Sequence, residues 1–129
     1  MKKIKIIDDD IEIVENITAI LKKEGYSITM MDTTEGAIEE ILRDKPDIVL
    51  LDVMFPENPA GGFDLSREIR KVDELKSLPI ILLTSINQEF PMDFSSKDID
   101  SEWFPVNEFL EKPVDVSILL EKIDKLIQK

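Results

Sequence analysis

Short apolar runs alternate along the chain with longer segments in which hydrophobic residues recur every three or four positions. Residues 48–51 and 80–83 are aliphatic throughout, which is typical of central strands in a parallel sheet that helices cover on both faces. Residues 4–7 predict a strand ahead of them, and residues 27–31 predict another at an edge of the sheet. Residues 109–110 predict a brief fifth strand.

Most segments that separate or follow these strands show helical spacing of their apolar residues. Gly25 is expected to end the first helix, and Thr33 or Thr34 is placed to cap the second helix at its N-terminus. The apolar positions predict helices around residues 13–21, 37–42, 65–72 and 116–127. This order of elements predicts an α/β fold with a doubly wound, five-stranded parallel sheet and right-handed crossovers.

Residues 87–105 interrupt the pattern. The segment contains Pro91 and Pro105 and no sustained helical period, and a structureless loop of that length is unusual inside a compact domain. We therefore expect an irregular or shortened fourth helix there. Trp103 and Phe104 in this segment either cover a small core of its own or form an exposed anchor for a partner.

Composition narrows the class of protein. A length of 129 residues suits one domain. The 28 acidic residues exceed the 16 basic ones, for a net charge of -12, which argues against direct binding to nucleic acid or to anionic membranes. The absence of cysteine and histidine excludes disulfides, histidine-based catalysis and histidine metal ligands. With no signal peptide and no apolar stretch that could span a membrane, we expect a cytoplasmic protein.

Polar residues with reactive side chains follow four of the predicted strands. Three aspartates occupy residues 8–10, and Asp52, Thr84 and Lys112 each stand at or after a later run. Because the carboxyl ends of parallel strands meet at one edge, these groups should share a crevice. Clustered carboxylates raise each other's pKa unless a cation neutralises them, and Mg²⁺ suits such oxygen ligands. Asp52 would then be a nucleophile beside a metal, able to accept a phosphoryl group.

Four segments resemble, in order, the receiver domain of two-component response regulators. Each motif is weak alone, but the ordered set is specific and spans essentially the whole chain. The segments are residues 6–10, 50–56, 81–85 and 109–113. The resemblance implies a flavodoxin-like fold with strand order 2-1-3-4-5 and a single receiver domain over residues 1–129, with no output domain.

The resemblance also assigns the site. Asp52 is the implied phosphoacceptor, and Asp8 and Asp9 are the acidic pair of a Mg²⁺ site completed by Asp52 and the backbone carbonyl of Met54. Such a protein is a phosphoacceptor that assists its own phosphorylation and dephosphorylation, and not a conventional enzyme. Asp10 is expected only to cap the following helix.

Three further roles follow from the same resemblance. Thr84 and Lys112 would contact the phosphoryl group, and Phe109 would be the switch aromatic. The alternatives are a packing role for Thr84, a solvated Lys112 and a plain core aromatic at Phe109. The implied partners are a histidine kinase or phosphotransfer protein as the donor and a downstream protein as the target, with a weak homodimer as one option.

The chain also departs from the family. The segment at residues 56–62 is longer than the usual turn, although Gly61 and Gly62 still permit a tight turn before the third helix. The stretch from Thr84 to Lys112 is also longer than usual. The resemblance therefore does not define the surface around the fourth helix and the fifth strand.

Two alternatives compete with a working receiver. A pseudo-receiver would keep the fold as a binding module without phosphorylation. A phosphohydrolase resembling the haloacid dehalogenase superfamily would use Asp8 as its nucleophile within an Asp-x-Asp motif. However, the chain lacks a cap and a second acidic motif, and Asp115 alone does not supply that motif.

Overall fold

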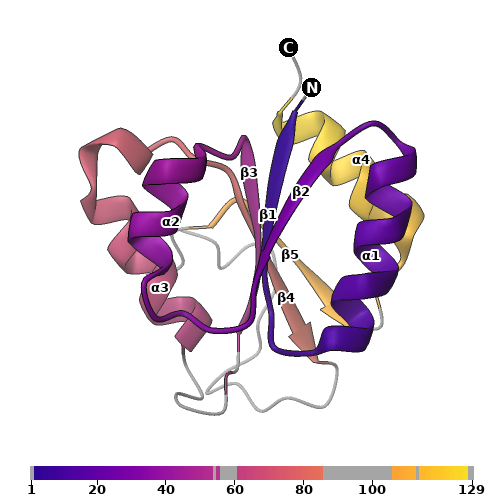
Figure 1. The fold of residues 1–129 in the computed structure, drawn as a ribbon, viewed down its shortest axis with the longest axis horizontal. Helices are drawn as coiled ribbons and strands as arrows, with labels where there is room; N and C mark the ends of the chain where they lie inside the picture. Colours follow the sequence, from indigo (N-terminus) through magenta and orange to yellow (C-terminus); the bar gives the residue numbers. More distant parts are fainter. Residues whose placement is uncertain (1, 54, 56–60, 86–105, 113, 128–129) are drawn as a thin grey trace.

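The core of the protein is a five-stranded parallel sheet with the order β2-β1-β3-β4-β5. The computed structural model describes residues 2–53, 55, 61–85, 106–112 and 114–127. All five strands run in the same direction, so their carboxyl ends lie toward the lower edge of the sheet in Figure 1. The strands are β1 (Lys3–Ile7), β2 (Ser27–Met31), β3 (Ile48–Asp52), β4 (Ile80–Ser85) and β5 (Glu108–Lys112). The predicted strands and their order are confirmed.

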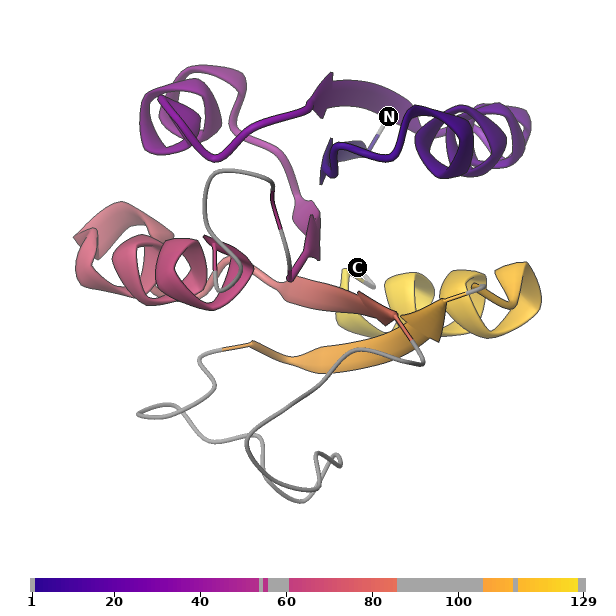
Figure 2. The ribbon, with the colours of Figure 1, turned by 90° about the horizontal axis from the view of Figure 1, so that it is seen from below.

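Helices cover both faces of the sheet. Figures 1 and 2 show α1 and α4 against one face and α2 and α3 against the other. The helices are α1 (Ile11–Lys23), α2 (Ala37–Asp44), α3 (Gly61–Lys71) and α4 (Val116–Leu126), with a short 3-10 helix η1 (Asp73–Leu75) after α3. No helix of the described residues is long and apolar enough to cross a membrane. The irregular helix expected within residues 87–105, and Trp103 and Phe104 with it, lie outside the described residues.

The apolar side chains of β3 and β4 contribute to two separate hydrophobic clusters, one on each face of the sheet. On β3, Val49 and Leu51 belong to the cluster under α2 and α3, whereas Ile48 and Leu50 belong to the cluster under α1 and α4. All four side chains are fully buried. Successive side chains of a strand point to opposite faces, so a strand covered on both sides needs apolar residues at every position.

The ends of α1 follow from local sequence. Asp10 is the N-cap, and its side chain accepts a hydrogen bond of 3.2 Å from the backbone N–H of Ile13. Gly25 follows the helix with a φ of 96°, and its N–H donates to the carbonyl of Lys22 at 3.0 Å. The next N–H, of Tyr26, donates to the carbonyl of Leu21, which completes a Schellman motif. The predicted roles of Asp10 and Gly25 are confirmed.

The predicted threonine cap of α2 is wrong. Gly36 holds the N-cap position with a φ of 73° and makes no side-chain capping bond. The hydroxyl oxygen of Thr33 instead accepts a hydrogen bond from the backbone N–H of Glu35 at 3.2 Å. A threonine that binds the N–H two residues ahead forms a turn before the helix, and the left-handed glycine then directs the chain into the helix.

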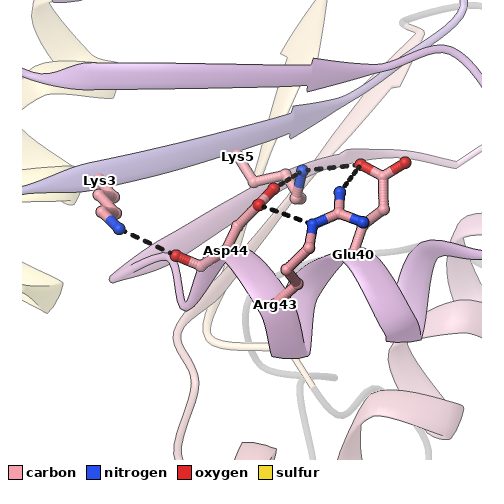
Figure 3. Close-up of polar contacts among 5 residues, drawn as sticks. All are labelled: Lys3, Lys5, Glu40, Arg43 and Asp44. Atoms are coloured by element: carbon pink, nitrogen blue, oxygen red, sulfur yellow. Dashed lines mark hydrogen bonds and ion pairs between the residues drawn. The ribbon is translucent and has the colours of Figure 1, made fainter.

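A buried lysine ties α2 to the sheet (Figure 3). Lys5 lies on β1, and its ammonium contacts Asp44 at 2.8 Å and Glu40 at 3.4 Å, both on α2. Arg43 contacts the same two carboxylates at 3.5 and 3.6 Å. The hydrogen bond from Lys5 is the main cause that holds the pKa of Asp44 below its usual range. We call Lys5, Glu40, Arg43 and Asp44 the Lys5 network.

Candidate functional site

Two neighbouring strands place a pair of aspartates at the carboxyl edge of the sheet. Ile7 of β1 lies beside Leu51 of β3, and each is followed directly by an aspartate, Asp8 or Asp52. Both aspartates are buried. The backbone N–H of Asp8 donates to the carbonyl of Met31, the last residue of β2, at 3.0 Å, which holds Asp8 beside the end of that strand. Carboxylate oxygens of Asp8, Asp9 and Asp52 all lie within 4.8 Å of one another, with Asp9 the most accessible.

Lys112 joins this cluster from the far side of β4. It is the last residue of β5, and its ammonium lies 2.9 Å from Asp8 Oδ2 and 3.2 Å from Asp52 Oδ1. The side chain therefore bridges two carboxylates that come from different strands. Three carboxylates and one ammonium make up this group, which we call the acidic site: Asp8, Asp9, Asp52 and Lys112.

The hydrogen bonds of the acidic site are unevenly shared. Asp8 Oδ1 accepts from the backbone N–H of Asp10 at 2.9 Å, and Asp52 Oδ1 accepts from Val53 N–H at 2.9 Å and from Lys112. Asp8 Oδ2 is buried and has no well-directed hydrogen-bond donor among the described residues, although the Lys112 nitrogen is close. Burying a carboxylate oxygen without a hydrogen-bond donor costs folding free energy. A cation that binds this oxygen would therefore reduce that cost.

Burial and charge shift the pKa of Asp52 upward. Burial is the larger cause and the nearby Asp8 carboxylate the second, while Lys112 and Val53 N–H oppose them, and the pKa of Asp52 rises to about 6. For Lys112, burial alone would lower the pKa, but its contacts with Asp8 and Asp52 outweigh burial and the pKa is raised. The lysine is therefore charged at neutral pH, and one positive charge does not offset the carboxylates around it.

The residues of this site fit a divalent, oxygen-binding cation. The donor set consists of carboxylate oxygens from Asp8, Asp9 and Asp52, which are ligands that Mg²⁺ accepts while it keeps several waters. A bound cation would offset the excess of negative charge and would give Asp8 Oδ2 a second partner besides the Lys112 ammonium. The geometry thus favours a metal centre next to the raised-pKa carboxyl of Asp52.

Gly62 allows α3 to approach the backbone of Asp52. A Cβ at Gly62 would lie 2.1 Å from the Asp52 carbonyl oxygen and 2.8 Å from Val53 Cα, whereas one at Gly61 would meet side-chain atoms, of Phe55 at 3.0 Å and of Thr34 at 3.6 Å. The N–H of Gly62 donates to the carbonyl of Val53 at 2.8 Å. The sequence indicates a tight turn here, but the two glycines are the first residues of α3. Gly62 is needed because a side chain at this position would collide with the backbone of Asp52 and Val53.

The remaining predicted site residues are only partly described. Thr84 lies in β4 one position past Leu83, which is paired with Asp52, and its side chain is outside the description. Met54 lies outside the described residues, as does Pro113. Phe109 is half-buried and packs against the apolar cluster on the α2 and α3 side of the sheet. Its switch role and its role as a plain core aromatic are both compatible with that position.

The chain is similar in sequence and in fold to response regulators and their receiver domains. Residues 4–124 match the family model of the response regulator receiver domain. Protein PilH of Pseudomonas aeruginosa is 28% identical over 127 residues, which cover 98% of each protein. The BeF3-activated receiver domain of Klebsiella pneumoniae RstA is 30% identical with a TM-score of 0.79, covering 99% of this chain and 100% of that one. The N-terminal domain of the nisin resistance regulator NsrR is 26% identical with a TM-score of 0.79, covering 99% of both chains.

Proposed function

Because this chain belongs to the response regulator receiver domain family, we propose that Asp52 accepts a phosphoryl group from a phosphohistidine donor. A carboxylate oxygen of Asp52 attacks phosphorus, a new P–O bond forms, and the P–N bond to the donor imidazole breaks. The imidazole leaves with the electron pair and takes up a proton. The observation that carries the proposal is the cluster of three carboxylates with oxygens within 4.8 Å of one another, two of which, Asp8 and Asp52, are bridged by Lys112.

The contacts of Asp52 suggest which oxygen reacts. Among the described residues, both hydrogen bonds to Asp52 go to Oδ1. Oδ2 is therefore the oxygen that we assign to the attack. Oδ1 stays held by Val53 N–H and Lys112, which orients the carboxylate before the reaction.

The metal site is part of the same proposal. Asp8, Asp9 and Asp52 would hold Mg²⁺ together with the backbone carbonyl of Met54. The bound ion would supply positive charge to the carboxylates and to the phosphoryl oxygens. Ionised Asp52 is the reactive form, and a pKa of about 6 without metal means that the carboxyl is protonated in part near that pH. Lys112 would then contact the transferred phosphoryl group as a point charge.

The last part of the proposal is how phosphorylation of Asp52 would change contacts with a downstream protein. The Thr84 hydroxyl would contact the phosphoryl group, and Phe109 would change its packing when that contact forms. The added charge would shift an equilibrium between two arrangements of the nearby loops and so change contacts with a downstream protein. A histidine kinase or phosphotransfer protein as the donor, a single receiver domain over residues 1–129 and a cytoplasmic location belong to this proposal. The family match is to the receiver domain, so the hydrolase alternative is not carried further.

Intact-mass spectrometry after incubation with acetyl phosphate tests the proposal. We expect one phosphoryl adduct on the wild-type chain with Mg²⁺, much less of it with EDTA, and none on Asp52→Asn. The matched control is Asp47→Asn, which changes an aspartate that binds the Lys3 backbone N–H at 2.7 Å, outside the acidic site. An adduct that persists on Asp52→Asn would place the phosphoacceptor elsewhere. A folded wild-type chain without any adduct would favour the pseudo-receiver.

A further inference from the structure

A surface groove borders the acidic site, with Asp8 in its lining, and lies between the start of α1, the end of β2 and the segment that leads into α2. Its volume is about 520 Å³, which is enough for several side chains and far more than a single ion needs. Half of its ten lining residues are carboxylates, and none is a lysine or arginine. We call it the α1–β2 groove.

Two of the lining residues are large, exposed hydrophobics. Ile11 at the start of α1 is 58% exposed and Met30 on the edge strand β2 is 52% exposed. Among the described residues only Ile118, on α4 and 42% exposed, is a third of this kind, and it does not line the groove. Single exposed hydrophobics are ordinary, but two that face one groove offer an apolar contact. Methionine adapts its shape to the surface it meets.

The negative charge of the groove is largely uncompensated. Glu15, Asp32 and Glu35 line it and have no ion-pair partner among the described residues. Glu40 also lines it but shares its charge with Lys5 and Arg43, as Figure 3 shows. The groove therefore repels anionic ligands and disfavours a second copy of a chain whose net charge is -12.

We propose that the α1–β2 groove docks a basic, amphipathic segment of a partner protein. Aliphatic side chains of that segment would pack against Ile11 and Met30, and its lysines or arginines would lie against Glu15, Asp32 and Glu35. This combination of apolar anchors and opposite charge gives affinity from burial and orientation from electrostatics. The proposal does not rest on the phosphorylation of Asp52, because none of these five residues belongs to the acidic site.

The test measures fluorescence anisotropy of a short labelled peptide that carries leucine and lysine at helical spacing. Two further peptides separate the contributions, one with serine in place of leucine and one with glutamate in place of lysine. We expect the leucine–lysine peptide to bind the wild-type chain and the other two to bind at least about tenfold more weakly, a change of about 1.4 kcal/mol. Equal binding of the serine–lysine peptide would show charge attraction alone and would overturn the proposal.

Matched variants locate the binding. The double variant Ile11→Ser/Met30→Ser should weaken binding by about tenfold, and Ile118→Ser should leave it unchanged. Glu15→Gln/Glu35→Gln should weaken binding and flatten its salt dependence, whereas Glu12→Gln/Glu121→Gln, at exposed sites outside the groove, should do neither. Circular dichroism would confirm that each variant is folded.

Two results would contradict the assignment. Equal loss of affinity in the groove variants and in their controls would mean that the peptide binds the acidic surface at large. Sedimentation that shows a concentration-dependent dimer of the wild-type chain, lost in Ile11→Ser/Met30→Ser, would assign this face to a second copy. Neither outcome bears on Asp52, since phosphorylation is measured separately by mass.

Discussion

Lys5 and Lys112 are two lysines of low exposure that each lie between two carboxylates. Their side chains are 0% and 11% exposed. Lys5 lies 2.8 and 3.4 Å from its two acids, and Lys112 lies 2.9 and 3.2 Å from its own. By distance alone the two arrangements are alike, yet one fastens a helix to the sheet and the other stands at the candidate site.

The difference lies in the balance of charge. In the Lys5 network Arg43 adds a second positive charge, so two cations face two partly exposed acids, and the pKa of Asp44 is lowered. The acidic site has three carboxylates and one ammonium, which contacts two of them, and the pKa of Asp52 is raised to about 6. A balanced group stabilises the fold as it stands, whereas an unbalanced group is poised to bind a cation.

Removing both acids from the Lys5 network should have the largest effect on stability. The double variant Glu40→Gln/Asp44→Asn leaves the Lys5 ammonium buried without a carboxylate, which should cost about 3 kcal/mol of unfolding free energy. Urea unfolding at neutral pH measures the loss. Glu39→Gln, at an exposed position of the same helix, is the control and should change little. A loss below about 1 kcal/mol would contradict a stabilising role for these two acids.

Removing the charge of Asp52 should increase the free energy of unfolding, whereas removing the acids of the Lys5 network should decrease it. A carboxyl whose pKa rises to about 6 in the folded state destabilises the protein when it is ionised. The penalty is absent below the unfolded value near pH 4, grows as the pH rises, and is complete above about pH 6. Asp52→Asn should therefore raise stability by about 1 to 2 kcal/mol at pH 7.5, because the upper limit of roughly 3 kcal/mol is reduced by the loss of a partner for Lys112.

The pH dependence separates this effect from a simple change in packing. Thermal unfolding of wild type and Asp52→Asn, compared from pH 4 to pH 8, should show a difference in melting temperature that fades toward pH 4. A stabilisation that is the same at every pH would point to packing and would contradict the unbalanced charge.

Mg²⁺ should stabilise the acidic site and leave the Lys5 network unaffected. At a tenfold excess of free ion over its dissociation constant, the wild-type chain should gain about 1.4 kcal/mol of unfolding free energy, reversed by EDTA. Asp9→Asn and Asp52→Asn should lose most of this gain, while Glu40→Gln should keep it. An equal gain in all variants would indicate a general ionic effect.

The smallest effect is expected when Lys5 is replaced by an apolar residue of similar length. In Lys5→Met the acids Glu40 and Asp44 keep Arg43 and contact with water, so the change in unfolding free energy should stay within about 1 kcal/mol. Lys112→Met, in contrast, removes the one cation that contacts Asp8 and Asp52 among the described residues and should raise the pKa of Asp52 further. A loss of several kcal/mol in Lys5→Met would contradict this expectation, because it would mean that an apolar side chain cannot replace the ion pairs between Lys5 and α2.

The fold could be predicted from the sequence because its signals are local. The uninterrupted runs of β3 and β4 indicate strands covered on both faces, and Gly25 marks the end of α1. Lys5 was missed because an Ile-Lys-Ile alternation indicates a solvent-facing lysine, and its partners lie on α2, 35 residues away in the case of Glu40. The sequence indicates a tight turn at Gly61 and Gly62, and the contact of Gly62 with the Asp52 backbone is visible only in the structure.

The site was predicted differently from the fold. Asp52 and Lys112 are 60 residues apart, and nothing in their spacing brings them together. Their positions after predicted parallel strands suggested a shared edge, and the resemblance to receivers supplied the roles. The roles of Thr84, Met54 and Phe109 rest on that resemblance and stay predictions.

The most direct test of the unbalanced site is a carbon-detected NMR titration of the Asp52 side-chain carboxyl, with and without Mg²⁺. We expect a pKa of about 6 without the ion and a clearly lower pKa when Mg²⁺ is present, because the bound cation favours the ionised form. A pKa near the ordinary aspartate value of about 3.9 without metal, or a raised pKa that Mg²⁺ does not change, would contradict the account.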